Sequence, residues 1–283
     1  MTCKYQYQER LEYFPRISYQ FLMLVFLVMG ISACNPKETK TQEEKNTTFS
    51  APGSYNIIGY VAGWTGFDIE KVDAIKLTHI NYAFANIREG KAVFDNQSDA
   101  GNVAKLVNLK QQNSSLKVLV SVGGWTWSKN FSDVALDANS RNIFAQSVVD
   151  MIKAHNLDGI DIDWEYPGQV GDNNIYRPED KENFTLLMAD LRNALELYGK
   201  PENKHYILTI ASGADTNWVK WTEMRKVQES LDFVNIMTYD MYHGGHTFTG
   251  HHSNLSGSDQ AIVGKGGGQI SAMSFFSSTD FTS

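Results

Sequence analysis

The stretch that decides the fold is DGIDIDWEYP, residues 158–167. Its acidic side chains are interleaved with isoleucines and a tryptophan, in a segment that otherwise has the composition of a buried strand. On a strand, residues two apart point the same way. The side chains therefore form two faces, with Asp161, Asp163 and Glu165 on one and Ile160, Ile162 and Trp164 on the other. We expect the apolar face to contact helices and the carboxylates to point into the fold.

The acidic face predicts a shared proton. Successive carboxylates would lie about 6.6 Å apart along the strand, close enough to perturb each other's ionisation. We expect at least one proton to be retained near neutral pH, which would make the group a general acid. Two alternatives stay open, a solvated edge strand and magnesium ligation by paired aspartates. An EF-hand loop does not fit, because its glycine position, counted from Asp161, is Tyr166.

Five further runs rich in β-branched and aromatic residues flank this strand along the chain. In all we expect strands at 55–63, 76–85, 116–124, 157–166, 205–212 and 231–240. Helical periodicity separates some of them, over 140–156 with Ser140 as its candidate cap and from Pro178 to Gly199. Strands that alternate with helices predict parallel pairing through crossover helices.

A (β/α)8 barrel and a doubly wound sheet both give this alternation. The unusual segments SVGGWTW (121–127), DIDWEYP (161–167) and MTYD (237–240) lie at the carboxyl ends of predicted strands, where barrel enzymes place their chemistry. A doubly wound sheet usually has a Gly-rich turn after its first strand, and none is found here. We therefore predict an α/β fold of the (β/α)8 TIM barrel type, occupying residues 53–283.

The predicted barrel is incomplete. Only 43 residues follow Asp240, and a strand with its return helix takes about 30 residues or more. This tail is rich in Gly, Ser, Thr and His and is typical of loop. We expect about six βα units, with the last two missing at the C-terminus, as in a truncated or frameshifted product or a fragment of a longer protein.

The N-terminal segment has the features of an export signal. An apolar run at 21–33 follows Arg10 and Arg16 and is shorter than a bilayer span. It ends in ISAC, which resembles the lipobox of bacterial lipoproteins, so Cys34 would be lipidated after removal of residues 1–33. Residues 34–52 are polar and predict a tether. We expect an exported cell-envelope lipoprotein or a secreted protein; an uncleaved anchor or a buried helix is the alternative.

Composition excludes several classes of protein. The net charge of -7 and the pI near 5.5 argue against nucleic-acid binding. Cys3 and Cys34 are the only cysteines, so the predicted domain has no disulfide framework. The histidines at 243, 246, 251 and 252 lack the spacing of a metal site, and GKGGG (264–268) is not a phosphate loop. We expect no metal, no cofactor, a monomer, and membrane contact only through the lipid.

The acidic residues Asp158, Asp161, Asp163 and Glu165 form the pattern DxxDxDxE, which resembles the signature of the family 18 glycoside hydrolases, the chitinases. NYAFA (81–85), SVGGWTWS (121–128) and MTYD (237–240) are similar to further motifs of that family, in the same order. The resemblance implies hydrolysis of β-1,4 bonds in chitin or N-acetylglucosamine oligosaccharides. It also implies a retaining mechanism in which the substrate's own acetamido oxygen is the nucleophile, a recognised exception among glycosidases.

The resemblance also implies roles for single residues. Glu165 would protonate the glycosidic oxygen and then activate water. Asp163 would orient the acetamido N–H, and Asp161 would share its proton or charge with Asp163. Tyr239 would donate a hydrogen bond to the acetamido carbonyl.

Substrate contacts are implied in the same way. Trp125 matches a position that stacks on a sugar ring, and Tyr60 and Phe84 match aromatic positions around the cleft floor. Met237 and Asp240 would line the subsite of the reacting sugar. Core packing is the alternative for each aromatic residue, and for Phe84 it has nearly equal support.

Some features point to structure or to other functions. We expect Trp127 and Trp164 to pack in the core, and Ser121 to support the first acidic residue. Two other functions stay open, an endo-β-N-acetylglucosaminidase acting on glycoproteins and an inactive chitin- or glycan-binding barrel. Retention of Glu165 argues against the inactive barrel.

Overall fold

The computed structural model describes residues 55–65, 67–245, 247 and 249–256. The predicted signal peptide (1–33), Cys34, the tether (34–52) and the run at 264–268 lie outside these residues. No helix within the described ranges is long and apolar enough to cross a bilayer.

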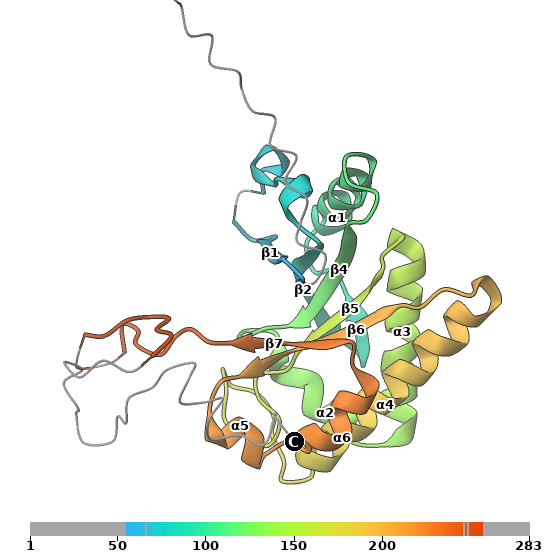
Figure 1. Cartoon of the computed structure of the whole chain (residues 1–283). Coiled ribbons are helices and arrows are strands. Elements are labelled where there is room, and N and C mark those ends of the chain that lie inside the picture. Colours follow the sequence, from blue (N-terminus) through green and yellow to red (C-terminus); the bar gives the residue numbers. More distant parts are fainter. Residues whose placement is uncertain (1–54, 66, 246, 248, 257–283) are drawn as a thin grey trace, which may run out of the picture. The chain divides into compact units, whose positions relative to one another are not determined.

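Six parallel strands form the centre of the domain, in the order β1-β2-β4-β5-β6-β7 (Figure 1). Their bounds are β1 Ile58–Ala62, β2 His79–Arg88, β4 Lys117–Gly123, β5 Gly159–Asp163, β6 Ile207–Gly213 and β7 Phe233–Met237. Each corresponds to one predicted strand, and each neighbouring pair is parallel. The prediction of a partial (β/α)8 barrel is confirmed, and within the described residues β1 and β7 are its two edge strands.

The sheet differs from the prediction at two places. A short strand β3, Lys91–Val93, pairs antiparallel with the end of β2 through a tight turn at Glu89 and Gly90, both with positive φ. The sequence prediction missed it because β2 continues beyond residue 85. In addition, β5 ends at Asp163, so Glu165 lies beyond the last paired residue of the strand.

The helices are α1 Asp99–Asn108, α2 Phe131–Ala135, α3 Ala138–His155, α4 Asp180–Gly199, α5 Thr216–Lys220 and α6 Met224–Val227. Short 3-10 turns occur at Ile69–Lys71, Ala74–Lys76, Leu109–Gln111, Ser128–Asn130, Lys200–Glu202 and Gln228–Ser230. The candidate cap of α3 was wrong. Asp137, three residues before the expected cap, is the N-cap and accepts a 2.9 Å hydrogen bond from the Ser140 amide, and the helix begins at Ala138.

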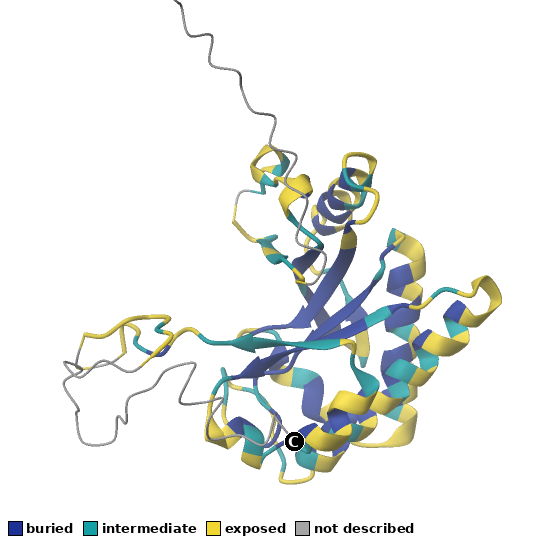
Figure 2. Cartoon of the chain, in the orientation of Figure 1, coloured by how far each residue is buried: buried dark blue, intermediate teal, exposed yellow. Residues whose placement is uncertain are grey.

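The core lies between the outer face of the sheet and the helices, with α3 and α4 side by side along that face (Figures 1 and 2). Ile160 and Ile162 are fully buried there, as the strand pattern predicts. Trp164 is also fully buried and stacks on Phe131, with ring centroids 5.3 Å apart. Its predicted packing role is confirmed; burial of such side chains stabilises the fold by about 1.5–3 kcal/mol each.

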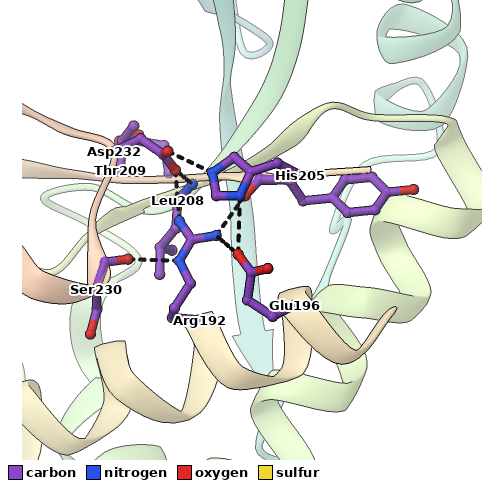
Figure 3. Close-up of polar contacts among 9 residues, drawn as sticks. Arg192, Glu196, His205, Leu208, Thr209, Ser230 and Asp232 are labelled. Atoms are coloured by element: carbon purple, nitrogen blue, oxygen red, sulfur yellow. Dashed lines mark hydrogen bonds and ion pairs between the residues drawn. The ribbon is translucent and has the colours of Figure 1, made fainter. Parts of the chain in front are cut away.

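Arg192 joins α4 to the amino ends of two strands (Figure 3). Its guanidinium donates to the carbonyl oxygens of Ser230 and Tyr206 and to Asp232, at 2.9, 2.8 and 2.6 Å. Asp232 also accepts from the Leu208 amide at 2.8 Å, so one carboxylate connects β6, the approach to β7 and the helix. This network holds the end of the barrel where β6 and β7 begin.

Candidate active site

Asp161 lies on the inward face of β5 and is fully buried. Four side chains from four other strands surround its carboxylate. Tyr60 Oη of β1 and Ser121 Oγ of β4 lie 2.9 and 2.7 Å from Oδ2. Thr209 Oγ1 of β6 and Asn235 Nδ2 of β7 lie 2.5 and 3.2 Å from Oδ1. Strand register produces this arrangement, because Ser121 and Thr209 are the residues paired with Asp161. The predicted support of the first acid by Ser121 is observed.

Burial and hydrogen bonding have opposite effects on the pKa of Asp161. Burial raises the pKa of this carboxyl above its usual value, while the four hydrogen bonds oppose the rise. Donors that point at a carboxylate stabilise its charged form.

Asp163 is the next inward residue of β5 and is 4% exposed. Its Oδ1 has no hydrogen-bond partner among the described residues. Burial, and then the negative charges of Glu165 and Asp161, raise the pKa of Asp163 well above its usual value. This direction agrees with the expectation that the acidic face retains a proton.

Glu165 follows β5 and is 8% exposed. Burial raises the pKa of Glu165, a hydrogen bond with the Tyr166 side chain opposes the rise, and the charge of Asp240 adds to it. The Glu165 amide donates a 2.9 Å hydrogen bond to Ser128 Oγ. Ser128 therefore helps to fix the backbone that carries this acid, a role that sequence reasoning missed.

Ser128 also connects the segments that follow β4 and β5. Its buried Oγ lies 2.9 Å from the carbonyl oxygens of Gly124 and Asp163, to which its proton can be donated. The Gly124 amide donates to the same Asp163 carbonyl at 2.8 Å. A Cβ on Gly123 would overlap that carbonyl, and φ there is 108°, which explains a glycine at this position.

Three predicted residues lie at the end of β7. Met237 is its last residue and is half-buried, and Tyr239 and Asp240 follow it. Burial, followed by the charges of Asp163 and Glu165, raises the pKa of Tyr239 to about 12. The Tyr239 ring stacks on His252 at 6.2 Å, and His252 Nδ1 lies 3.4 Å from Asp240 Oδ1. Tyr239 is thus in the electrostatic field of the carboxylates.

Aromatic side chains cluster beside the acids. Trp125 is 53% exposed and meets Tyr166 edge-on at 6.4 Å. Phe84 is half-buried and lies face to face with Trp64 at 5.5 Å, with Trp127 edge-on to both. Trp64 is 57% exposed and was missed by sequence reasoning. Trp127 has the packing contacts expected of it but is only half-buried.

Tyr60 differs from the aromatic platform that the sequence suggested. Although 43% of the residue is exposed, its hydroxyl bonds to Asp161 inside the barrel. Burial, together with the negative charge of Asp161, raises the pKa of this phenol well above its usual value. Its hydroxyl therefore remains a donor at neutral pH.

The predicted histidine positions form no metal centre that can be described. Among the residues that the structure places, no group of three or more His, Cys, Asp or Glu side chains could hold a metal ion. His246 lies outside those residues, and the absence of a metal or cofactor stays a prediction.

The fold and the site together define a class: a parallel α/β barrel with buried, interacting carboxylates at the carboxyl end of its central strand. Comparison with known proteins agrees. Residues 56–275 match the family described as Glycosyl hydrolases family 18, and the chain belongs to that family.

Similar proteins include bacterial members of this family. Chitinase A1 of Niallia circulans is 37% identical over 260 residues, which cover 74% of this chain and 37% of that protein. A solved family 18 N-acetylglucosaminidase from Paenibacillus barengoltzii is 38% identical, with a TM-score of 0.69, and covers 79% of this chain and 63% of that one. A solved Bacillus thuringiensis chitinase is 32% identical, with a TM-score of 0.72. The match covers 79% of this chain and 46% of that chitinase. The chain therefore spans less than two thirds of each of these relatives.

Proposed function

We propose that this protein hydrolyses β-1,4 glycosidic bonds in chitin or chito-oligosaccharides, by a retaining mechanism assisted by the substrate. The observation that supports this most is the contrast within the acidic group. Asp161 is held by four hydrogen bonds, whereas Asp163 beside it has an oxygen without a partner among the described residues and faces Glu165.

Glu165 is the general acid in this proposal. Its raised pKa favours the protonated form, so it can give a proton to the glycosidic oxygen as the bond to the anomeric carbon breaks. The carboxylate that results then takes a proton from the water that completes hydrolysis. Such proton transfer contributes about 10²- to 10⁴-fold to the rate.

Asp163 and Tyr239 hold the acetamido group in this proposal. The free oxygen of Asp163 accepts the acetamido N–H, and the Tyr239 hydroxyl donates to the carbonyl oxygen, which attacks the anomeric carbon. As the oxazolinium ring forms, the glycosidic bond breaks. The electron pair of that bond leaves with the aglycone oxygen. Water then opens the ring at the same carbon, so two inversions give net retention.

Exposed aromatic faces supply the sugar platforms. Trp125 presents 53% of its surface to solvent beside Tyr166, which follows Glu165 directly. The apolar face of a pyranose ring suits such a platform. Tyr60, Phe84, Met237 and Asp240 are proposed to line the same cleft.

A second candidate substrate class is a short or protein-linked N-acetylglucosamine chain. The Paenibacillus relative is described as an N-acetylglucosaminidase, which supports testing it. An inactive glycan-binding barrel is the other alternative, and the buried, protonatable Glu165 argues against it.

The proposed location is the bacterial cell envelope, through a lipid on Cys34, with the protein otherwise monomeric. The support is the ISAC sequence after an apolar run. Incorporation of labelled palmitate into the wild type but not into Cys34→Ser would support it, and equal labelling would refute it.

The activity is tested by release of a fluorophore from chitobiose and chitotriose conjugates. We compare the wild type, Glu165→Gln and the control Glu229→Gln, an exposed residue away from the site. Activity that falls at least 100-fold only in Glu165→Gln supports the proposal. Wild-type activity that survives in Glu165→Gln refutes the acid assignment, and chitin binding without turnover favours the glycan-binding barrel.

A further inference from the structure

Asn235 reaches two members of the acidic centre at once. Its Nδ2 lies 3.2 Å from Asp161 Oδ1 and 3.1 Å from the Tyr60 hydroxyl. An amide nitrogen can only donate hydrogen bonds. The Tyr60 oxygen therefore accepts from Asn235, and its own proton points at Asp161 Oδ2, 2.9 Å away. Asn235 thus fixes the direction of two hydrogen bonds to one carboxylate.

Thr209 is a further hydrogen-bond partner of the Asp161 carboxylate. Its hydroxyl and Asn235 occupy Oδ1 of Asp161, while Tyr60 and Ser121 occupy Oδ2, so each oxygen has two neighbours. A proton on Asp161 could point only at Thr209 or Ser121, since the other two are committed donors. That proton would reverse one hydrogen bond and weaken the rest, because donors bind an ionised carboxylate more strongly.

The neighbouring acid has the opposite surroundings. Burial raises the pKa of both Asp161 and Asp163, but hydrogen bonds oppose the rise only at Asp161, and neighbouring charge adds to it at Asp163. Among the described residues, the titratable groups that interact with Asp161 are Tyr60 of β1, Asp163 of β5 and Tyr239 after β7. Strands β4, β6 and β7 contribute the uncharged donors already named.

We propose that Asn235 and Thr209 are positioning residues that keep Asp161 ionised and so place the shared proton on Asp163. The inference deepens the proposed function, on which it rests. With Asp161 charged, its negative charge favours the protonated form of Asp163, whose Oδ1 has no partner among the described residues and can accept a hydrogen bond from the substrate. If Asp161 were protonated first, that arrangement would be lost, so the acidic limb of the pH profile should report on Asp161.

Thr209 offers a matched pair of substitutions. Thr209→Val keeps the shape and removes the donor, whereas Thr209→Ser keeps a hydroxyl. We expect Thr209→Val to move the acidic limb of kcat/KM upward by about one pH unit, since loss of one donor to a charged group is of that size. Thr209→Ser should keep the wild-type limb, and Asn235→Leu should shift it in the same direction as Thr209→Val.

A second readout does not depend on turnover. Titration of the 13C-labelled aspartate carboxyl groups by NMR, with Asp161 assigned by its loss in Asp161→Asn, gives its pKa directly. A rise of about one unit in Thr209→Val or Asn235→Leu supports the inference even if the wild type hydrolyses no chito-oligosaccharide, which would refute the proposed function alone.

Several outcomes would overturn the inference. An unchanged Asp161 titration in a Thr209→Val protein that circular dichroism shows to be folded would do so. So would equal shifts in Thr209→Val and Thr209→Ser, because packing and not the donor would then be responsible. If Thr209→Val does not fold, Asn235→Leu is decisive in the same titration.

Discussion

The Tyr60 hydroxyl donates a 2.9 Å hydrogen bond to Asp161, although the residues are 101 positions apart and their strands are not neighbours. In a flat sheet, β1 and β5 would be separated by three strand spacings, roughly 14 Å. Asn235 of β7 reaches the same hydroxyl at 3.1 Å, where a flat sheet would place it roughly 24 Å away. The sheet is therefore curled, and its interior contacts join its two edge strands through the acidic centre.

Removal of the Tyr60 hydroxyl should weaken both the fold and the site. Tyr60→Phe takes one donor from Asp161 and leaves Asn235 Nδ2 without one of its two acceptors. We expect the free energy of unfolding to fall by about 1–3 kcal/mol, measured by urea denaturation. Tyr55→Phe, at a residue 74% exposed, is the control and should change it little. Equal effects of the two substitutions would contradict the bridging role.

Gly123 is predicted to be intolerant of any side chain. A Cβ there would overlap the Asp163 carbonyl oxygen and lie 2.6 Å from the Phe131 ring, and the backbone has a positive φ. We expect Gly123→Ala to destabilise the protein by several kcal/mol, on the order of 3. The measurement is the shift in the thermal unfolding midpoint.

Gly101 supplies the matched control for this substitution. It lies in α1, and a Cβ added there would have no atom within 4 Å, so Gly101→Ala should stabilise by about 0.5–1 kcal/mol through helix propensity. Opposite signs for the two alanines are the expected result. A tolerated Gly123→Ala would show that the segments after β4 and β5 can separate.

Local patterns were sufficient to predict the acidic strand. Side chains alternate strictly along a strand. This alternation alone placed Asp161 and Asp163 inside the barrel and the two isoleucines at 160 and 162 on its outer face. The position of Glu165 beyond the last paired residue could not be predicted, since the point at which strand pairing ends depends on the neighbouring strands.

The partners of the acids were harder to predict. Thr209 and Asn235 are polar residues within largely apolar strands, and their role as partners of Asp161 depends on register across strands far apart in the chain. A polar residue at an inward position was the signal available for each. Ser128 begins a short 3-10 turn and Trp64 follows β1, and in such short segments sequence periodicity does not indicate where a side chain points.

Asp232 should make the protein sensitive to acid. Burial acts to raise the pKa of this carboxyl, but hydrogen bonds from the Leu208 amide and His205 and the charge of Arg192 lower it (Figure 3). A lowered pKa means that its contribution is fully present above the unfolded value of about 3.9 and is lost as pH falls through the folded value. Asp232→Asn should therefore cost about 1–3 kcal/mol at pH 7.

The pH dependence of this loss distinguishes charge from packing. The difference in unfolding free energy between the wild type and Asp232→Asn should shrink below about pH 4, as urea denaturation at several pH values would reveal. Glu202→Gln, on an exposed turn, should show no such trend. A difference that stays constant down to about pH 3 would mean that the ionised carboxylate is not what stabilises this end of the barrel.

Tyr239 should act through its hydroxyl and remain protonated over the working range. Tyr239→Phe removes the proposed donor to the acetamido carbonyl, so we expect kcat on chitotriose conjugates to fall by roughly 10²- to 10³-fold, with a smaller change in KM. Because its pKa is raised to about 12, chiefly by burial, the wild type should keep this donor through about pH 10.

Two results would contradict this role of Tyr239. One is a Tyr239→Phe variant with unchanged kcat, and the other is an alkaline limb near about pH 10 that disappears in that variant, since the limb would then belong to the Tyr239 phenol. Tyr198→Phe on α4 is the control and should leave both kcat and the limb unchanged. A spectrophotometric phenolate titration of the wild type and Tyr239→Phe gives the same pKa without reference to activity, because their difference isolates the Tyr239 ionisation.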